Sequence, residues 1–399
     1  MKKQTIMIML LAAALCLAAC SKTPVETVDT TPSTTEATTA PTEETKPPKM
    51  PVDQQPMAAI SLPVVTESET AEDGTVVFNY TYQNISLIVP DPEVADKVIV
   101  DFLNRTDMHD SAESIRTAAI AAYKQTPSYW TPYLSQSVYT PTRIDQSVLS
   151  LFGSYVSYDG AAHGGQVSKA VNYDLLTGNV LTWEDILAED VTHEDMCKLV
   201  LEALAAQKEE KMLFEGYETI VQELFSHGLQ HNTDWYLSGN GLCYFFSPYD
   251  IGPFSSGTII AEIPYSSLTG ILDDAYFPAE RDLATGDLQV QLFEEAKAEN
   301  FSQFAEVVLE AGTDKILVSV DTSVYDLRLQ TGTWSANGSV FNPTATVLAA
   351  CALTPGDAVM IEAPLADEQT QLRLIYNNGE TETVLYIESD AGTVSLTEK

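Results

Sequence analysis

The histidines are the first residues to test for chemistry, because imidazole binds metals and transfers protons near neutral pH. His227 and His231 are four residues apart, and His193 and Cys197 share that spacing. On a helix this spacing places both side chains on one face, where they can hold zinc. The glutamate of a His-Glu-x-x-His protease is absent, and Gly228 is expected to end the helix before His231. The sequence therefore predicts no metal site and no cofactor.

A second candidate for chemistry is the glycine-rich stretch around His163. His163-Gly164-Gly165 is similar to an oxyanion loop, and Asp159 could orient the imidazole. No Gly-x-Ser-x-Gly nucleophile accompanies them, so a tight turn that needs glycine's freedom is the favoured interpretation. The many carboxylates do not single out a glycosidase pair, and the glycines follow no nucleotide-binding pattern. We therefore expect a binding protein and not an enzyme.

Two segments are the predicted ligand-binding surfaces. The first is a proline-stiffened loop over 248–257, and the second is the glycine-rich connection over 158–165. Aromatic side chains on stiff loops lose little entropy on association and are frequent at binding hot spots. The alternative is that these side chains fold back onto the sheet. The candidate residues are Pro248, Tyr249, Asp250, Ile251, Pro253, Phe254, Tyr158 and His163.

The first 65 residues predict export and attachment to a membrane. Lys2 and Lys3 precede an apolar run from Ile6 to Ala19, which is shorter than the about 20 residues of a spanning helix. The run ends in Leu17-Ala18-Ala19-Cys20, which resembles the cleavage box of bacterial lipoproteins. The resemblance implies that Cys20 carries a lipid and that residues 1–20 are a signal peptide. An ordinary secretory signal is the alternative.

Composition limits the partners and the number of domains. Residues 21–65 are rich in Thr, Pro and Glu, which predicts a disordered spacer that cannot bury enough apolar surface to fold. The 399-residue chain has a formal net charge of −37, which excludes nucleic acid and suits a basic partner. The length of the chain after the spacer suggests two domains. The lipid would anchor the protein to the membrane, with the folded region on the extracytoplasmic side.

Strand and helix patterns predict an α+β fold, an antiparallel sheet with packed helices. Three cysteines remain after Cys20, and we expect them to be buried thiols. A Cys197–Cys243 bridge is the alternative. Residues 281–399 are expected to form a small β-sandwich-like domain preceded by a helix over Leu292–Leu309. The strands expected there are Lys315–Val320, Leu327–Leu329, Val347–Leu353, Val359–Ile361, Leu372–Tyr376 and Val384–Ile387.

Several motifs resemble the extracellular domain of the RsiV type, which is domain-of-unknown-function family 3298. They occur in the same order as in that family. They are Tyr158–Gly165 (YDGAAHGG), Asn172–Gly178 (NYDLLTG), Leu181–Leu187 (LTWEDIL), Tyr244–Pro253 (YFFSPYDIGP) and Ile263–Leu268 (IPYSSL). The preceding region is similar to a companion domain that also occurs in peptidoglycan deacetylases. The resemblance implies a domain over 66–280, with a companion part at 66–145 and a main part at 146–280.

This resemblance implies an extracytoplasmic sensor or binding module. RsiV-type anti-sigma factors capture lysozyme, but this sequence has no second apolar segment of spanning length and no sigma-binding part, so we expect no anti-sigma role. Capture of a lysozyme-like basic protein or of a peptidoglycan fragment is the function that the resemblance leaves to this chain. The alternative, which the resemblance to the companion domain of deacetylases implies, is a cell-wall glycan hydrolase or a deacetylase accessory protein.

Overall fold

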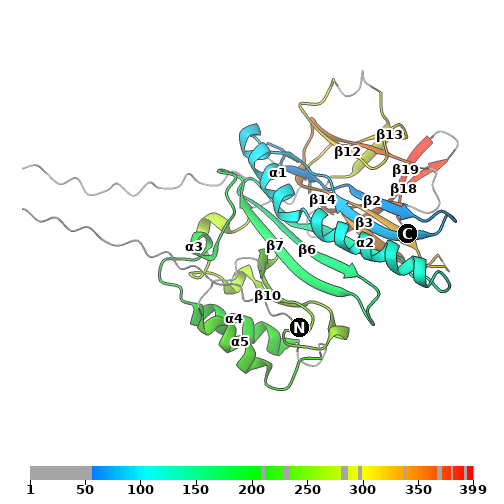
Figure 1. Cartoon of the computed structure of the whole chain (residues 1–399). Helices are drawn as coiled ribbons and strands as arrows, with labels where there is room; N and C mark the ends of the chain where they lie inside the picture. The colour runs from blue at the N-terminus through cyan, green and yellow to red at the C-terminus, as the bar shows by residue number, and fades with distance from the viewer. Residues whose placement is uncertain are drawn as a thin grey trace, which may run out of the picture. The chain divides into compact units, whose positions relative to one another are not determined.

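The structure is a computed structural model that describes residues 56–207, 212–227, 234–279, 286–294, 299–336, 338–365, 371–378, 381–390 and 393–398. Cys20 and His231 lie outside these residues. The described chain is mostly β, with several antiparallel sheets and a few helices, in broad agreement with the predicted α+β class (Figure 1). None of the described helices is both long and apolar enough to cross a membrane.

The first sheet is five-stranded and has the order β2-β3-β5-β6-β7. Its strands are β2 (Val64–Thr70), β3 (Val76–Gln83), β5 (Tyr133–Ile144), β6 (Val148–Tyr158) and β7 (Gly165–Asp174). Strands β3 and β5 are parallel, and α1 (Pro92–Thr106) and α2 (His109–Gln125) lie between them in the chain. The predicted division at residue 145 falls between two strands of this one sheet, so the two predicted parts are continuous.

A three-stranded antiparallel sheet follows, in the order β10-β9-β8. One of its faces packs on helices around Trp183 and Trp235, whose ring centroids are 4.7 Å apart. The strands and α-helices are β8 (Trp235–Leu237), β9 (Gly241–Phe246), β10 (Ile259–Pro264), α3 (Trp183–Ile186), α4 (His193–Ala206) and α5 (Tyr217–Ser226). Short 3-10 turns are η2 (Phe254–Ser256), η3 (Tyr265–Ser267) and η4 (Asp274–Tyr276).

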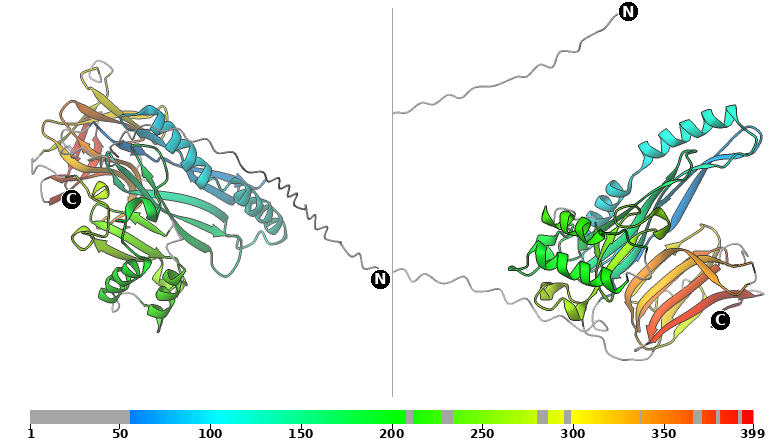
Figure 2. Two further views of the ribbon diagram at one scale, coloured as in Figure 1. Left: turned by 90° about the vertical axis from the view of Figure 1, so that its left-hand side faces the viewer. Right: turned by 90° about the horizontal axis from the view of Figure 1, so that it is seen from below.

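Most of the remaining strands form two sheets that share one apolar core. The four-stranded sheet has β11 (Leu288–Leu292), β13 (Asp314–Val320), β16 (Asp357–Ala363) and β12 (Gln303–Val308). The other sheet contains β14 (Val324–Trp334), β15 (Phe341–Leu353), β17 (Gln371–Asn378), β18 (Thr381–Asp390) and β19 (Thr393–Thr397). Figure 2 shows these strands together, in orange and red.

The predicted helix over Leu292–Leu309 is wrong. Leu292 ends β11, and Gln303–Val308 is β12, which pairs in parallel with β16. Ala305 and Val307 are buried while Glu306 is exposed, and this alternation fits a strand with one face on the core. The pairing partner lies about fifty residues later in the chain, so local helix preference is overridden by a non-local contact.

The predicted spacer over 21–65 extends too far. β1 (Ala59–Ser61) is completely buried, and it lies between β15 and β4 (Ser86–Ile88) in the large sheet, which therefore has seven strands. Residues from both ends of the chain share a core, for example Ile60 and Ala349. The region after residue 280 is therefore not packed only against itself, because its large sheet incorporates an earlier strand.

A buried arginine also connects distant segments of the chain. The guanidinium of Arg143, whose side chain is 4% exposed, forms an ion pair with Asp145 at 2.6 Å and donates to the Tyr265 hydroxyl at 2.8 Å and to the Tyr276 carbonyl. The cysteines Cys197, Cys243 and Cys351 are buried thiols, as predicted, and Cys197 and Cys243 form no disulfide bridge.

Candidate recognition surface

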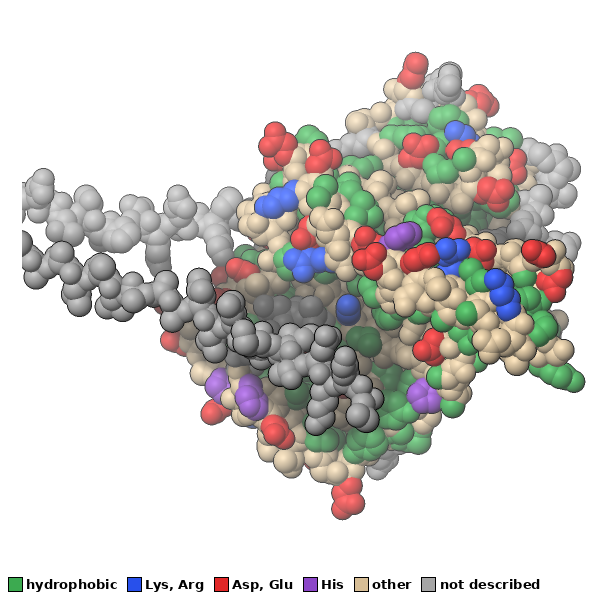
Figure 3. Space-filling view, in the orientation of Figure 1, with side chains coloured by type: hydrophobic (Ala, Val, Ile, Leu, Met, Phe, Trp, Pro, Cys, Tyr) green, Lys and Arg blue, Asp and Glu red, His purple; other side chains and the backbone are tan. Residues whose placement is uncertain are grey.

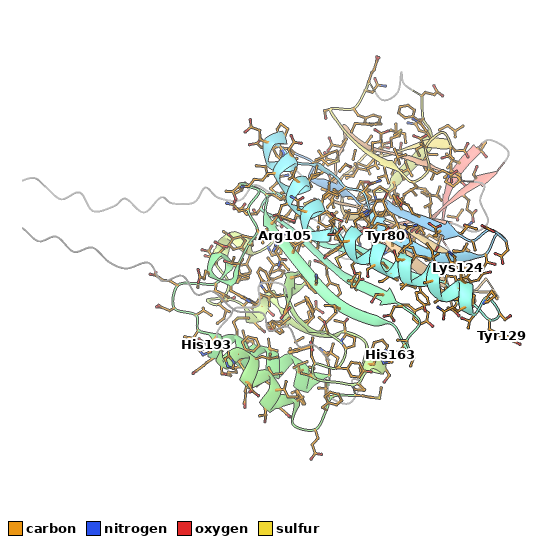
Figure 4. All side chains as sticks on the ribbon, viewed as in Figure 1. Tyr80, Arg105, Lys124, Tyr129, His163 and His193 are labelled. Carbon is orange, nitrogen blue, oxygen red and sulfur yellow. The ribbon has the colours of Figure 1, made fainter. Side chains whose placement is uncertain are left out.

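The structure brings the two predicted binding segments together. The His163 ring lies 5.1 Å from the Phe254 ring and 6.4 Å from the Tyr249 ring, and the rings of Tyr249 and Phe254 are 5.6 Å apart. Figure 4 shows His163 at the far end of the β6–β7 hairpin, well away from His193. Three rings from two loops distant in the sequence thus form one cluster.

Hydrogen bonds fix the loop over 247–257 to strand β7. The backbone N–H of Ser168 donates to the Ser247 hydroxyl at 3.1 Å, and the hydroxyls of Ser168 and Thr258 are 2.6 Å apart. Within the loop, the Ser247 N–H donates to the Asp250 carboxylate at 2.6 Å, and the Tyr249 N–H donates to the Gly252 carbonyl at 3.1 Å. The loop is therefore held in one conformation before any partner binds.

Tyr249 has the most unusual backbone of the loop. Its φ is +78°, in the left-handed region that side chains other than glycine, asparagine and aspartate rarely adopt. The side chain is 56% exposed, so burial of the ring does not compensate for this conformation. Strain held by the surrounding structure is common where a side chain has to be presented to a partner.

Some candidate residues have structural roles instead. Ile251 is fully buried in the core around α4 and α5, and Pro248 is also buried, so both anchor the loop and cannot contact a partner. Tyr158 contacts Tyr133 in an edge-to-face arrangement at 5.6 Å and is not part of the His163 cluster. The carboxylate of Asp250 is exposed but caps the turn at Ser247, and loss of water around it raises its pKa against the effect of that hydrogen bond.

Two further apolar side chains lie beside the loop and were not predicted from the sequence. Met212 is 58% exposed and Phe214 is 38% exposed. The Phe214 N–H donates to the Ile251 carbonyl at 2.9 Å, and the Met212 carbonyl lies beside Gly252, so this segment packs on the loop. We call His163, Met212, Phe214, Tyr249 and Phe254 the aromatic patch. The available signal in the sequence was a run of three large apolar residues, Met212-Leu213-Phe214.

His163 and Asp159 both make local hydrogen bonds within their turn. Nδ1 of His163 lies 2.9 Å from the Gly164 carbonyl, and the Asp159 carboxylate accepts from the Ala161 N–H, so Asp159 shapes the turn and does not orient the imidazole. Within the described ranges, no three His, Cys, Asp or Glu side chains are arranged to hold a metal. What the patch offers is apolar and aromatic contact area.

Acidic side chains are spread over the visible face of the molecule. Figure 3 shows fewer basic side chains among them. Such a distribution attracts a basic partner over distance without defining where it docks. The aromatic patch, and not the charge, is therefore the feature that specifies a location.

Comparisons with known proteins match one segment of the chain to a protein family. A family model described as "Protein of unknown function (DUF3298)" matches residues 184–266. A crystal structure of a DUF3298 family member from Bacteroides fragilis is 19% identical, with a TM-score of 0.42, over 55% of this chain and 94% of that chain. A DUF3298 family protein from Pseudomonas aeruginosa is 20% identical, with a TM-score of 0.38, over 57% of this chain and all of that one. No curated protein matches the chain. The segment that matches DUF3298 contains Met212, Phe214, Tyr249 and Phe254, that is, every residue of the aromatic patch except His163.

Proposed function

We propose that this protein is an extracytoplasmic binding protein, anchored by a lipid on Cys20, that captures a cell-wall-active ligand through the aromatic patch. The carrying observation is the convergence of His163, Tyr249 and Phe254 on one surface. A patch of exposed apolar side chains on a soluble fold commonly marks a site of protein contact. The RsiV-like sequence motifs support the choice of a lysozyme-like basic protein as the partner, with a peptidoglycan fragment as the second ligand of the same class.

The geometry of the aromatic patch suits binding of a ligand more than its chemical conversion. Rigid aromatic side chains lose little conformational entropy on binding, and the loop is already held by its hydrogen bonds to Ser168. The negative charge of the chain would accelerate the encounter with a basic partner, whereas the apolar contacts would slow its release. Binding is therefore expected to weaken only partly as the salt concentration rises.

The test compares the purified mature chain with Tyr249→Ala/Phe254→Ala on a surface carrying a basic lysozyme, and in sedimentation with peptidoglycan sacculi. The double variant is expected to lose about tenfold or more in affinity, because hot-spot aromatics carry most of the binding energy. Tyr129→Ala is the matched control, since Tyr129 is fully exposed and also has a positive φ, of 65°, but lies on the α2–β5 connection. Binding of neither probe, or equal affinity of the double variant, would refute the proposal.

The anchor is tested separately. Cys20→Ala is expected to move the protein from the membrane fraction to the soluble extracytoplasmic fraction, because one lipidated residue supplies the attachment. A variant that stays in the membrane fraction would contradict the lipid anchor while leaving the binding proposal intact.

A further inference from the structure

A second surface is a groove of about 800 Å³ between α4 and α5. The two helices lie side by side in Figure 1, and both pack on the core around Trp183 and Trp235. Along α4 the groove extends from His193 to Ala205, which corresponds to about 18 Å of helix at 1.5 Å per residue. It is therefore long enough to hold about three turns of another helix. We refer to it as the α4–α5 groove.

Helix α4 has two apolar stripes, and only one of them is used up by the core. The first stripe is fully buried and consists of Met196, Val200 and Leu204. The second stripe is shifted by one residue, lines the groove, and consists of Cys197, Leu201 and Ala205. Cys197 is buried, Leu201 is half-buried and Ala205 is exposed, so this stripe becomes more accessible toward the end of the helix. A helix that packs on one core needs one stripe, and the second is available to a partner.

Helix α5 forms the other side of the groove with mixed chemistry. Tyr217 and Phe225 are buried at its floor. Glu218, Gln222 and Ser226 recur every four residues and form a polar rim above them. The groove is thus apolar on its floor and on the α4 side, and polar along the α5 rim. This combination matches the two faces of an amphipathic helix.

The charge around the groove is predominantly negative. Helices α4 and α5 together contain five carboxylates, one lysine and one histidine. Three of the carboxylates, Glu194, Glu202 and Glu218, line the groove. The lysine, Lys198, lies 4.0 Å from Glu202, and both side chains are largely exposed, so this pair is weak and a basic partner can compete for Glu202. Carboxylates beside an apolar floor favour a partner whose apolar face is bordered by Lys or Arg.

We propose that the α4–α5 groove binds a basic amphipathic helix of a partner protein. The apolar face of that helix packs on Leu201 and Ala205, and its basic side chains pair with Glu194 and Glu202. A helix placed between two neighbouring helices buries its anchors at the spacing i, i+3, i+4 and i+7. This site is separate from the aromatic patch and does not depend on the function proposed there.

The experiment follows the fluorescence anisotropy of a labelled peptide titrated with the purified mature chain at physiological ionic strength. The peptide contains only leucine and lysine, with the leucines at the spacing i, i+3, i+4 and i+7, and has about 14 residues, or four helical turns. A peptide of the same composition in scrambled order has no apolar face and is the control ligand.

The variants change the two sides of the predicted contact separately. Leu201→Gln removes the apolar contact, and Glu194→Gln/Glu202→Gln removes two exposed charges. Glu184→Gln/Glu113→Gln is the matched control for the charges, because both residues are exposed, helical and outside the groove. Glu184 lies in the first turn of its helix, as Glu194 does, and Glu113 is paired with a basic residue one turn away, as Glu202 is.

The amphipathic peptide is expected to bind saturably to the wild type and to the control variant. It should bind about tenfold more weakly to Leu201→Gln and about fivefold more weakly to the groove charge variant. The Tyr249→Ala/Phe254→Ala variant should bind the peptide as the wild type does, which separates this site from the aromatic patch. Ala205→Lys, at an exposed position in the groove, provides the same test if Leu201→Gln does not fold.

Four outcomes would each overturn the proposal. They are no saturable binding to the wild type, equal binding of the scrambled peptide, unchanged affinity of either groove variant, and loss of binding by the variant of the aromatic patch.

Discussion

The aromatic patch and the buried polar group around Arg143 expose their side chains to opposite degrees. The patch exposes rings on loops that meet at the end of a hairpin, so a large partner can cover it and displace water over a wide area. The Arg143 side chain is only 4% exposed, and its bonds to Asp145, Tyr265 and Tyr276 join segments that are distant in the sequence. One fold thus contains an exposed apolar surface suited to a large partner and a buried polar group suited to holding the fold together. Mutations that affect one and spare the other can test this distinction.

The largest effect is expected from Arg143→Met, in the buried polar group. The substitution leaves the Asp145 side chain, which is only 13% exposed, without its ion pair and removes the donor to Tyr265 and Tyr276, which should lower the free energy of unfolding by about 3–5 kcal/mol. Urea unfolding followed by tryptophan fluorescence measures the change. Arg105→Met, which breaks a half-exposed pair with Asp101, is the control and should cost about 1 kcal/mol or less. Similar losses for both variants would show that Arg143 is not a structural anchor.

A smaller loss is expected from Ile251→Ala beneath the patch. Ile251 is fully buried, so the truncation should lower the free energy of unfolding by about 3 kcal/mol through lost contacts and a residual cavity. Tyr249→Ala, two residues away and exposed, should change it by only about 0.5 kcal/mol. The comparison separates the anchor of the loop from its contact residue, and nearly equal urea midpoints would remove that distinction.

The smallest effect has the opposite sign. Tyr249→Gly relieves the left-handed backbone, which costs about 1–2 kcal/mol, but glycine also gains freedom in the unfolded chain, which offsets up to about 1 kcal/mol. We expect a net stabilisation of about 0.5 kcal/mol together with weaker binding to lysozyme. Tyr129→Gly should give the same stabilisation with unchanged binding, since its φ is also positive. Destabilisation by Tyr249→Gly would show that the ring supports the fold.

The sequence predicted the parts of the patch that follow from local patterns. Proline and glycine marked both loops, and runs of β-branched and aromatic residues marked the strands beside them, so the meeting of His163 with Phe254 could be anticipated. The burial of Ile251 could not be predicted, because the sequence does not show whether an apolar side chain in a loop faces the core or a partner. Met212 and Phe214 were missed because only the folded chain shows which loop they adjoin.

The errors in the fold have a common cause, which is pairing between segments distant in sequence. β12 finds its partner in β16, and the three-residue β1 finds one in β15, nearly three hundred residues later. Neither partner can be read from a local window, and β1 is too short to produce a pattern of its own. The bonds from Arg143 to Tyr265 and Tyr276 are unpredictable for the same reason, since Arg143 lies 122 and 133 residues before these partners.

The position of β1 has a mechanical consequence. This strand is flanked on both sides by ladder partners, β15 and β4, and it is the first strand that the described chain contributes. Tension arriving along the preceding residues would pull β1 lengthwise and load both ladders in shear, so that their hydrogen bonds resist together instead of opening one after another. The point where force enters the molecule is thus a strand enclosed within a sheet.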